Sequence, residues 1–179
     1  YQTLPQACER APEVDDAEGA RYPMSTIDGS ETCFVWQHGD LEIHVPGAVG
    51  FAIMHYMNVI GDDEFLHNEG LEMVLQICRY YASRGDWSQR TGEYGFWCVM
   101  GPDEFHMMVH NNAYTNYLAK QLFEYALREM KRLEHEAPDV LACVKSKVQL
   151  RPDEPANWQK MAENMRLNYD EGTKLYEQH

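Results

Sequence analysis

The chain has 179 residues, 44% of them hydrophobic and 12% aromatic, which is enough for one globular domain with a sizeable core. Its formal net charge of −14 excludes the basic surface that nucleic acids and anionic membranes require. No run of about 18 apolar residues occurs, so no membrane-spanning helix is predicted. A small neutral substrate is compatible with this composition.

The five cysteines are scattered along the chain without a C-x-x-C pair. Cys78 and Cys98 have apolar neighbours, as structural thiols usually do. An odd number of widely spaced cysteines favours reduced thiols, and we therefore predict a cytoplasmic protein. The chain begins with Tyr1 and carries no signal peptide, so we expect a fragment or a processed protein.

Apolar residues at helical spacing predict the first two helices, over 47–60 and 63–84. The second is expected to end at Gly85, because glycine commonly follows the last turn of a helix. The apolar stripe of the first helix is Val49, Ala52, Ile53, Tyr56, Met57 and Ile60. The stripe of the second helix is Leu66, Met73, Val74, Ile77, Cys78 and Tyr81.

The segment 94–100, YGFWCVM, is the one stretch that indicates a strand. A long helix is predicted over 113–135, entered through Asn112 because asparagine is a favourable N-cap residue. A weaker helix over 138–148 and a shorter one over 154–167 follow. The apolar stripe of the long helix is Leu118, Leu122, Ala126, Met130 and Leu133.

Long loops join these helices, at 20–46, 86–111 and 168–179. Loops longer than about 12–15 residues are usually functional or disordered, and these are too aromatic for disorder. No internal repeat or low-complexity linker divides the chain, so residues 1–179 are predicted to form a single segment. The expected fold is all-α, with a site built from the loops at one end.

The stretch 101–112, GPDEFHMMVHNN, is rich in polar residues that fix backbone geometry. Gly101 and Pro102 set a turn, and a carboxylic acid held beside an apolar wall, here Phe105, suits general-acid catalysis near neutral pH. The plain alternative is a solvated Asp-Glu pair in a loop, followed by an N-capped helix.

The same stretch also suggests a metal site, because His106 and His110 are four positions apart and would share one face of a helix. Gly101-Pro102 and the N-cap argue against a helix there, and no third ligand is near in sequence. We therefore predict no metal.

Two other loops carry polar residues that have ordinary explanations. In GARYPMSTIDGSET, 19–32, IDGS is typical of a surface turn. In DLEIHVPGAVGFAI, 40–53, Glu42 and His44 precede an apolar helix, whose dipole favours an acid at its start.

Taken together, these stretches resemble glycoside hydrolase family 65, whose members include maltose, kojibiose and trehalose phosphorylases. The family pattern G-P-D-E-[YF]-H, a short gap and N-N-A-[YF]-T-N is matched by GPDEFH and NNAYTN. GARYPMSTIDGSE, EIHVPGAVGFAI and FLHNEGLEMVLQICRYYASR resemble further family segments. The resemblance covers about residues 1–135 continuously, and YDEGTKLYEQH resembles a later segment of the family.

The resemblance implies that Glu104 is the general acid. It places His44 and Tyr22 in loops at the sugar-facing end of the fold. It also implies a set of residues that line or brace the site around the acid: Asp103, His106, Asn111 and Asn112.

The implied reaction is phosphorolysis of an α-glucoside with inversion, which releases β-glucose 1-phosphate. Inorganic phosphate is then a co-substrate and no cofactor is expected. An inverting hydrolase needs a second carboxylate to activate water, whereas phosphate arrives as an anion and attacks the anomeric carbon directly. Hydrolysis by the same scaffold, and a non-catalytic helical carbohydrate-binding module, are the alternatives.

The family fold is an (α/α)6 barrel, which needs roughly 350 residues at about 12–20 residues per helix plus loops. We therefore expect residues 1–179 to be an incomplete part of that barrel, and the full-length protein to be a homodimer. Met107, His110 and Met24 depart from residues common in the family, which leaves the acceptor sugar open.

Overall fold

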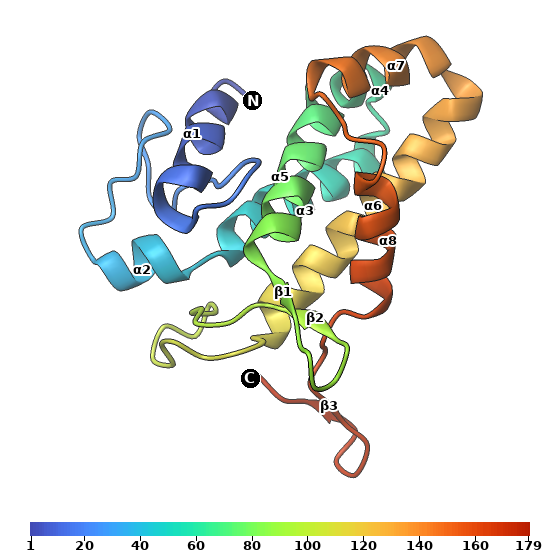
Figure 1. Ribbon diagram of the computed structural model, residues 1–179. Helices are drawn as coiled ribbons and strands as arrows, with labels where there is room; N and C mark the ends of the chain where they lie inside the picture. The colour runs from blue at the N-terminus through green and yellow to red at the C-terminus, as the bar shows by residue number, and fades with distance from the viewer.

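The computed structural model describes residues 1–179 as packed helices joined by loops (Figure 1). The helices are α1 (Leu4–Asp15), α2 (Trp36–Leu41), α3 (His44–Ile60), α4 (Asp63–Phe65), the π-helical turn η1 (Leu66–Gly70), α5 (Leu71–Arg84), α6 (Ala113–Glu136), α7 (Pro138–Lys147) and α8 (Glu154–Glu163). Two antiparallel pairs of short strands complete it: β1 (Asp86–Trp87) with β2 (Tyr94–Gly95), and β3 (Tyr169–Asp170) with β4 (Leu175–Tyr176). In Figure 1 the loops before α6 and after α8 lie at the lower end, and the loop between α1 and α2 lies beside α1.

The all-α prediction is confirmed, and every predicted helix occurs with small changes of boundary. The strand predicted over 94–100 is wrong beyond Gly95, because the chain then leaves β1 and only Val99 forms a bridge, to Val109. Two helices were not predicted, α1 and α2. The buried stripe of α1 is mostly alanine, and α2 has only six residues, so neither gives a strong apolar period.

Helix α5 is the centre of the core. It contacts α1, α3, α6, α7 and α8. Its buried side chains form one broad apolar face. Those side chains are Leu71, Met73, Val74, Leu75, Ile77, Cys78, Tyr80 and Tyr81. A glycine must follow α5 because a Cβ at Gly85 would lie 2.3 Å from the Tyr94 hydroxyl oxygen.

The predicted stripe of α6 is buried at all five positions. On one side α6 packs against α8, where Phe123 and Trp158 stack with ring centroids 6.5 Å apart. On the other side it crosses α3 at Gly47 and Gly50. A Cβ at Gly50 would lie 2.4 Å from Cδ2 of Leu122, so this close crossing depends on the absence of a side chain.

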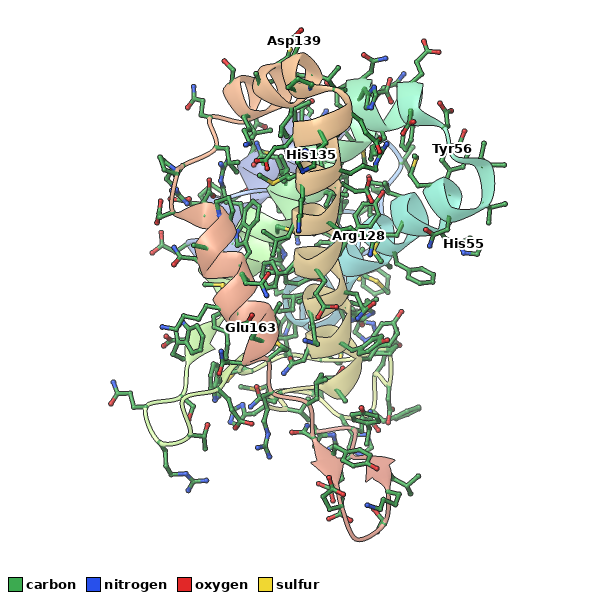
Figure 2. The ribbon with its side chains drawn as sticks, turned by 90° about the vertical axis from the view of Figure 1, so that its right-hand side faces the viewer. His55, Tyr56, Arg128, His135, Asp139 and Glu163 are labelled. Carbon is green, nitrogen blue, oxygen red and sulfur yellow. The ribbon has the colours of Figure 1, made fainter.

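The predicted apolar stripe of α3 is only partly correct. Ile53 is buried, but Ala52, Tyr56 and Ile60 are exposed. Helix α3 contacts α6 through Gly47 and Gly50 and not through its larger apolar residues, because glycine lets the two backbones approach. Figure 2 shows Tyr56 with His55 on the part of α3 that extends away from α6.

All five cysteines are free thiols. Cys78 is buried as predicted, whereas Cys98 is exposed, contrary to the prediction. The Cys98 backbone has φ 54°, in the left-handed region, and its segment belongs to a surface loop. No helix of the chain combines the length and apolar character needed to cross a membrane.

The α3–α6 crossing gives a test of the fold. We expect Gly50→Val to lower the free energy of unfolding by about 1–3 kcal/mol, because the added methyl groups overlap Leu122. Thermal unfolding of the intact protein measures this effect, and Ala48→Val, at an exposed position of the same helix, is the matched control. Equal midpoints for the two variants would contradict the tight crossing.

Candidate active site

The acid loop, residues 96–112, joins β2 to α6 and carries the predicted acid. Its base is closed by two backbone hydrogen bonds: the Val99 N–H donates to the Val109 oxygen at 3.0 Å, and the Val109 N–H donates to the Val99 oxygen at 2.9 Å. The Asn111 N–H donates to the oxygen of Phe96 at 2.7 Å. Residues 100–108 therefore form a closed excursion whose two ends are fixed together.

Two asparagines join the acid loop to the helical core. The Asn112 side chain caps α6, accepting from the Thr115 backbone N–H at 3.1 Å, which confirms the predicted N-cap. The Asn111 backbone, at φ 55°, lies in the left-handed region that asparagine tolerates. Its side-chain oxygen accepts from Asn116 at 3.3 Å, and its backbone oxygen accepts from Asn168 at 2.7 Å. Both asparagines therefore brace the loop.

Glycines make room for these asparagines. A Cβ at Gly95 would lie 1.9 Å from the Asn111 side-chain oxygen, and a Cβ at Gly101 would lie 2.3 Å from Nδ2 of Asn112. Only a residue without a side chain fits at either place. The glycine before Pro102 thus allows the loop to pack against the helix cap that supports it.

The tip of the acid loop is organised by Asp103. Its carboxylate accepts from the Phe105 N–H at 3.2 Å and pairs with His106 Nδ1 at 2.7 Å. A hydrogen bond from the Gln178 side chain, together with those from His106 and Phe105, lowers the pKa of Asp103. The predicted apolar wall is wrong, because the Phe105 side chain is 95% exposed and points away from the protein core.

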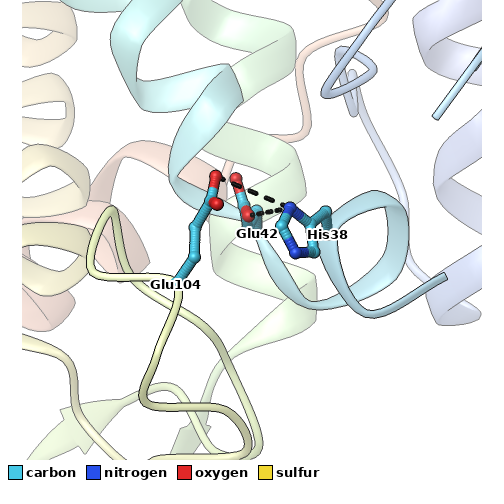
Figure 3. Close-up of side chains that lie close together, drawn as sticks. All are labelled: His38, Glu42 and Glu104. Carbon is cyan, nitrogen blue, oxygen red and sulfur yellow. Dashed lines mark ion pairs between the residues drawn. The ribbon is translucent and has the colours of Figure 1, made fainter. Parts of the chain in front are cut away.

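Glu104 meets two side chains from the α2 segment, and we call Glu104, His38 and Glu42 the acid cluster (Figure 3). His38 Nδ1 lies 3.5 Å from Oε1 of Glu104 and 3.4 Å from Oε1 of Glu42. The Glu104 side chain is 44% exposed, whereas that of Glu42 is 2% exposed. One acid therefore faces solvent, and the other lies behind it.

Burial dominates the electrostatics behind Glu104. It raises the pKa of Glu42 to about 7, an effect that the nearby Glu104 carboxylate increases and His38 opposes. Burial lowers the pKa of His44, whose Nε2 lies 3.8 Å from Oε2 of Glu42. Nδ1 of His44 also lies 3.4 Å from the Met100 oxygen, so His44 joins the start of α3 to the acid loop.

The α2 segment is held in place by two arginines, the buried Arg21 and the half-buried Arg10. Arg21 Nη2 donates to the backbone oxygens of Gly39 at 2.9 Å and Asp40 at 2.7 Å. Arg10 donates to the same Gly39 oxygen at 3.0 Å. Both cations thereby satisfy carbonyl groups at the C-terminal end of α2, where positive charge is favourable. The Met100 N–H donates to the Leu41 oxygen at 2.9 Å and attaches the acid loop to this segment.

The structure brings His44 to the acid cluster and does not bring Tyr22 there. Tyr22 is buried, and its hydroxyl has no hydrogen-bond partner. Burial raises the pKa of Tyr22, and the charges of Cys8 and Glu72 add to that shift. Its role in binding substrate stays a prediction. His38 was not predicted, although His38 and Glu42 are four positions apart, which places them on one face of α2 and its C-cap.

The structure separates the two histidines weighed as a metal pair. His110 Nδ1 accepts from the Cys98 N–H at 3.2 Å, and His106 pairs with Asp103. The acid cluster is the one group of three His, Cys, Asp or Glu side chains whose donor atoms approach within 4.8 Å of one another. The absence of a metal stays a prediction.

Comparison with known proteins identifies the family. The sequence model of the glycosyl hydrolase family 65 central catalytic domain matches residues 1–179. The chain belongs to glycosyl hydrolase family 65. It is 35% identical over 170 residues to an α,α-trehalose phosphorylase of Geobacillus stearothermophilus, covering 95% of this chain and 22% of that protein. It is 34% identical over 184 residues to a kojibiose phosphorylase of Caldanaerobacter subterraneus subsp. tengcongensis, covering 96% of this chain and 24% of that protein.

A solved structure assigned as a kojibiose phosphorylase from the human microbiome aligns with a TM-score of 0.92 and 35% identity. The alignment covers 100% of this family 65 chain and 26% of the other chain. The prediction of an all-α segment of an (α/α)6 barrel is therefore confirmed. The chain spans about a quarter of the length of these relatives.

The glycine–asparagine contact gives the first test of the site. We expect Gly101→Ala to displace the Asn112 side chain, which costs about 1 kcal/mol of cap stabilisation and moves Glu104. Thermal unfolding and turnover of the intact protein measure the two effects. Gly172→Ala, at an exposed turn where a Cβ meets only an Asp170 oxygen at 3.3 Å, is the control. Unchanged stability and turnover in Gly101→Ala would contradict the bracing.

The buried acid gives a test through pH. The pKa of Glu42 is about 7 in the folded protein, against an ordinary value of 4.5. The protonated carboxyl group therefore contributes to the free energy of unfolding fully below about pH 4.5, and this contribution is lost as the pH rises through 7. We expect Glu42→Gln to be more stable than the parent protein at about pH 8, by up to about 3 kcal/mol, and equally stable at about pH 4. Thermal unfolding at both pH values tests this. A pH-independent difference in Tm would contradict it.

Proposed function

We propose that this family 65 chain supplies the general acid of an inverting phosphorylase, with Glu104 donating a proton to the departing oxygen of an α-glucoside. The observation that carries the proposal is the position of Glu104, at the tip of a loop braced at both ends and with its carboxyl group open to solvent. The relatives named as trehalose and kojibiose phosphorylases support the reaction class.

The chemistry requires one proton donor and one nucleophile. As the glycosidic bond breaks, charge develops on the leaving oxygen and the sugar takes on oxocarbenium character. The Glu104 carboxyl group donates its proton to that oxygen, while inorganic phosphate attacks the anomeric carbon from the opposite face. The products are β-glucose 1-phosphate and the free acceptor, and no cofactor takes part.

Glu42 is poorly placed to act as the base of an inverting hydrolase. Oxygens of Glu42 and Glu104 come within 4.8 Å of each other. The carboxyl groups of inverting hydrolases are about 6.5–9.5 Å apart, because a water molecule must fit on the far side of the sugar. A phosphorylase needs no such base, which favours phosphorolysis over hydrolysis for this pair of acids.

The tip of the acid loop offers the side chains that would distinguish acceptor sugars. Met107 and Met108 are exposed beside Glu104, and His110 lies at the other end of the excursion. Met24 lies outside this loop, where Glu31 holds its backbone N–H at 2.8 Å. Trehalose, kojibiose and maltose are therefore all candidate substrates, and the proposal does not choose among them.

The role of Glu104 has a direct test. We expect Glu104→Gln in the intact protein to reduce turnover by about 10²–10⁴-fold, because the amide keeps the shape of the side chain but is not an acid. Glu163→Gln, on the exposed surface of α8, is the matched control and should retain full turnover. Turnover of Glu104→Gln within tenfold of the parent would discard Glu104 as the acid and favour a non-catalytic module.

The reaction class is tested by phosphate dependence. The intact protein is incubated with trehalose, kojibiose and maltose, with and without inorganic phosphate, and the products are identified by NMR. We expect release of β-glucose 1-phosphate only when phosphate is present. Release of glucose at equal rates without phosphate would establish the hydrolase alternative. The homodimer and the cytoplasmic location stay predictions.

A further inference from the structure

We propose that His38 and Glu42 are positioning residues for Glu104: His38 orients the acid from between the two carboxyl groups, and Glu42 places a buried carboxyl group behind it. This inference rests on the proposed role of Glu104 as the proton donor. It assigns a function to two side chains whose arrangement the packing of α2 and α3 does not explain.

The first observation is that one ring nitrogen serves two acids. His38 Nδ1 lies 3.4 Å from Oε1 of Glu42 and 3.5 Å from Oε1 of Glu104 (Figure 3). The bridge engages one Glu104 oxygen and leaves the other for a substrate. Since His38 belongs to a helix anchored by Arg21, the bridge ties an exposed acid to a rigid part of the fold.

The second observation is that Glu42 is buried without full hydrogen bonding. Its side chain is 2% exposed, and its Oε1 has no hydrogen-bond partner. Buried polar atoms are nearly always satisfied, so an unsatisfied carboxyl oxygen calls for an explanation other than stability. A role in catalysis supplies that explanation, because the unsatisfied oxygen faces the His38 nitrogen that also faces Glu104.

The charged and titratable groups around Glu42 come from four segments. His38 lies on α2, His44 starts α3, Glu104 lies on the acid loop, and Glu31 precedes α2. Glu31 is paired with Arg10 at 3.2 Å, which reduces its effect. The strongest charge coupling across the site is therefore between the two acids of the cluster, with His38 as their common partner.

These contacts give a physical consequence for proton donation. Two carboxylates that share one site do not ionise together, because like charges at short distance repel. The two carboxyl groups offer oxygens within 4.8 Å of each other, so a charge on Glu42 acts directly on the group that delivers the proton. The proton moves from Glu104 to the leaving oxygen, and no other transfer is required. His38 Nδ1 lies 3.5 Å from the carboxylate that Glu104 has then become.

The first experiment removes the charge of Glu42 and keeps its shape. We expect Glu42→Gln in the intact protein to move the alkaline limb of the pH profile of kcat to lower pH by about one unit. Above that limb kcat should fall about tenfold, while KM for the glucoside stays unchanged, because the charge acts on proton donation and not on sugar binding. Glu163→Gln is the matched control, because Glu163 lies on α8, where Figure 2 labels it.

The second experiment separates the bridge from simple packing. His38→Ala removes the bridging nitrogen and is expected to lower kcat about tenfold with little change in KM. His38→Asn keeps a donor near the position of Nδ1, and we expect it to restore most of that loss. His135→Ala, on the exposed end of α6 in Figure 2, should leave kcat unchanged.

Three results would overturn the inference. The first is a pH profile of kcat for Glu42→Gln that equals the profile of the parent protein. The second is an equal loss of kcat in His38→Ala and His38→Asn. The third is loss of activity on dialysis against a chelator with recovery on adding Zn²⁺, since the cluster would then hold a metal. If Glu104→Gln is itself fully active, the proposed function fails first, and that outcome is distinct from all three.

Discussion

The arrangement of this chain depends on the burial of α5. The broad apolar face of this helix is stable only when other helices cover it. Five helices from distant parts of the sequence do so, namely α1, α3, α6, α7 and α8. Covering α5 in this way brings the start of α6 and the start of α3 near the same end of the molecule, which is where the acid loop lies (Figure 1).

Polar groups then give that end its precise geometry. The free N–H groups at the start of α6 need acceptors, and Asn112 supplies one. Asn111 links the residue after β2, helix α6 and the chain after α8 through its backbone and side chain. An exposed loop would ordinarily be mobile, but here each end is tied to a buried element. Glu104 is thereby presented to solvent from a rigid support.

The acid cluster, unlike the braced loop, lowers the stability of the fold. Burial of Glu42 opposes its ionisation, and one of its oxygens lacks a partner, so the site is destabilising at neutral pH. Proteins tolerate such groups mainly at functional sites, where the rest of the fold compensates. Here the compensation comes from the enclosed helices and from the arginines that anchor α2.

The helices with strong apolar periods, the Asn112 cap and the segment that carries Glu104 could be predicted, because they depend on residues that are close in sequence. Helix α2, the exposed face of α3 and the exposure of Phe105 could not. Those depend on which surfaces meet, and glycines in α3 allowed a contact that the apolar pattern did not predict. The meeting of His38 and Glu42 with Glu104 was decided by tertiary structure alone, since more than 60 residues separate Glu42 from Glu104 and only packing around α5 brings them together.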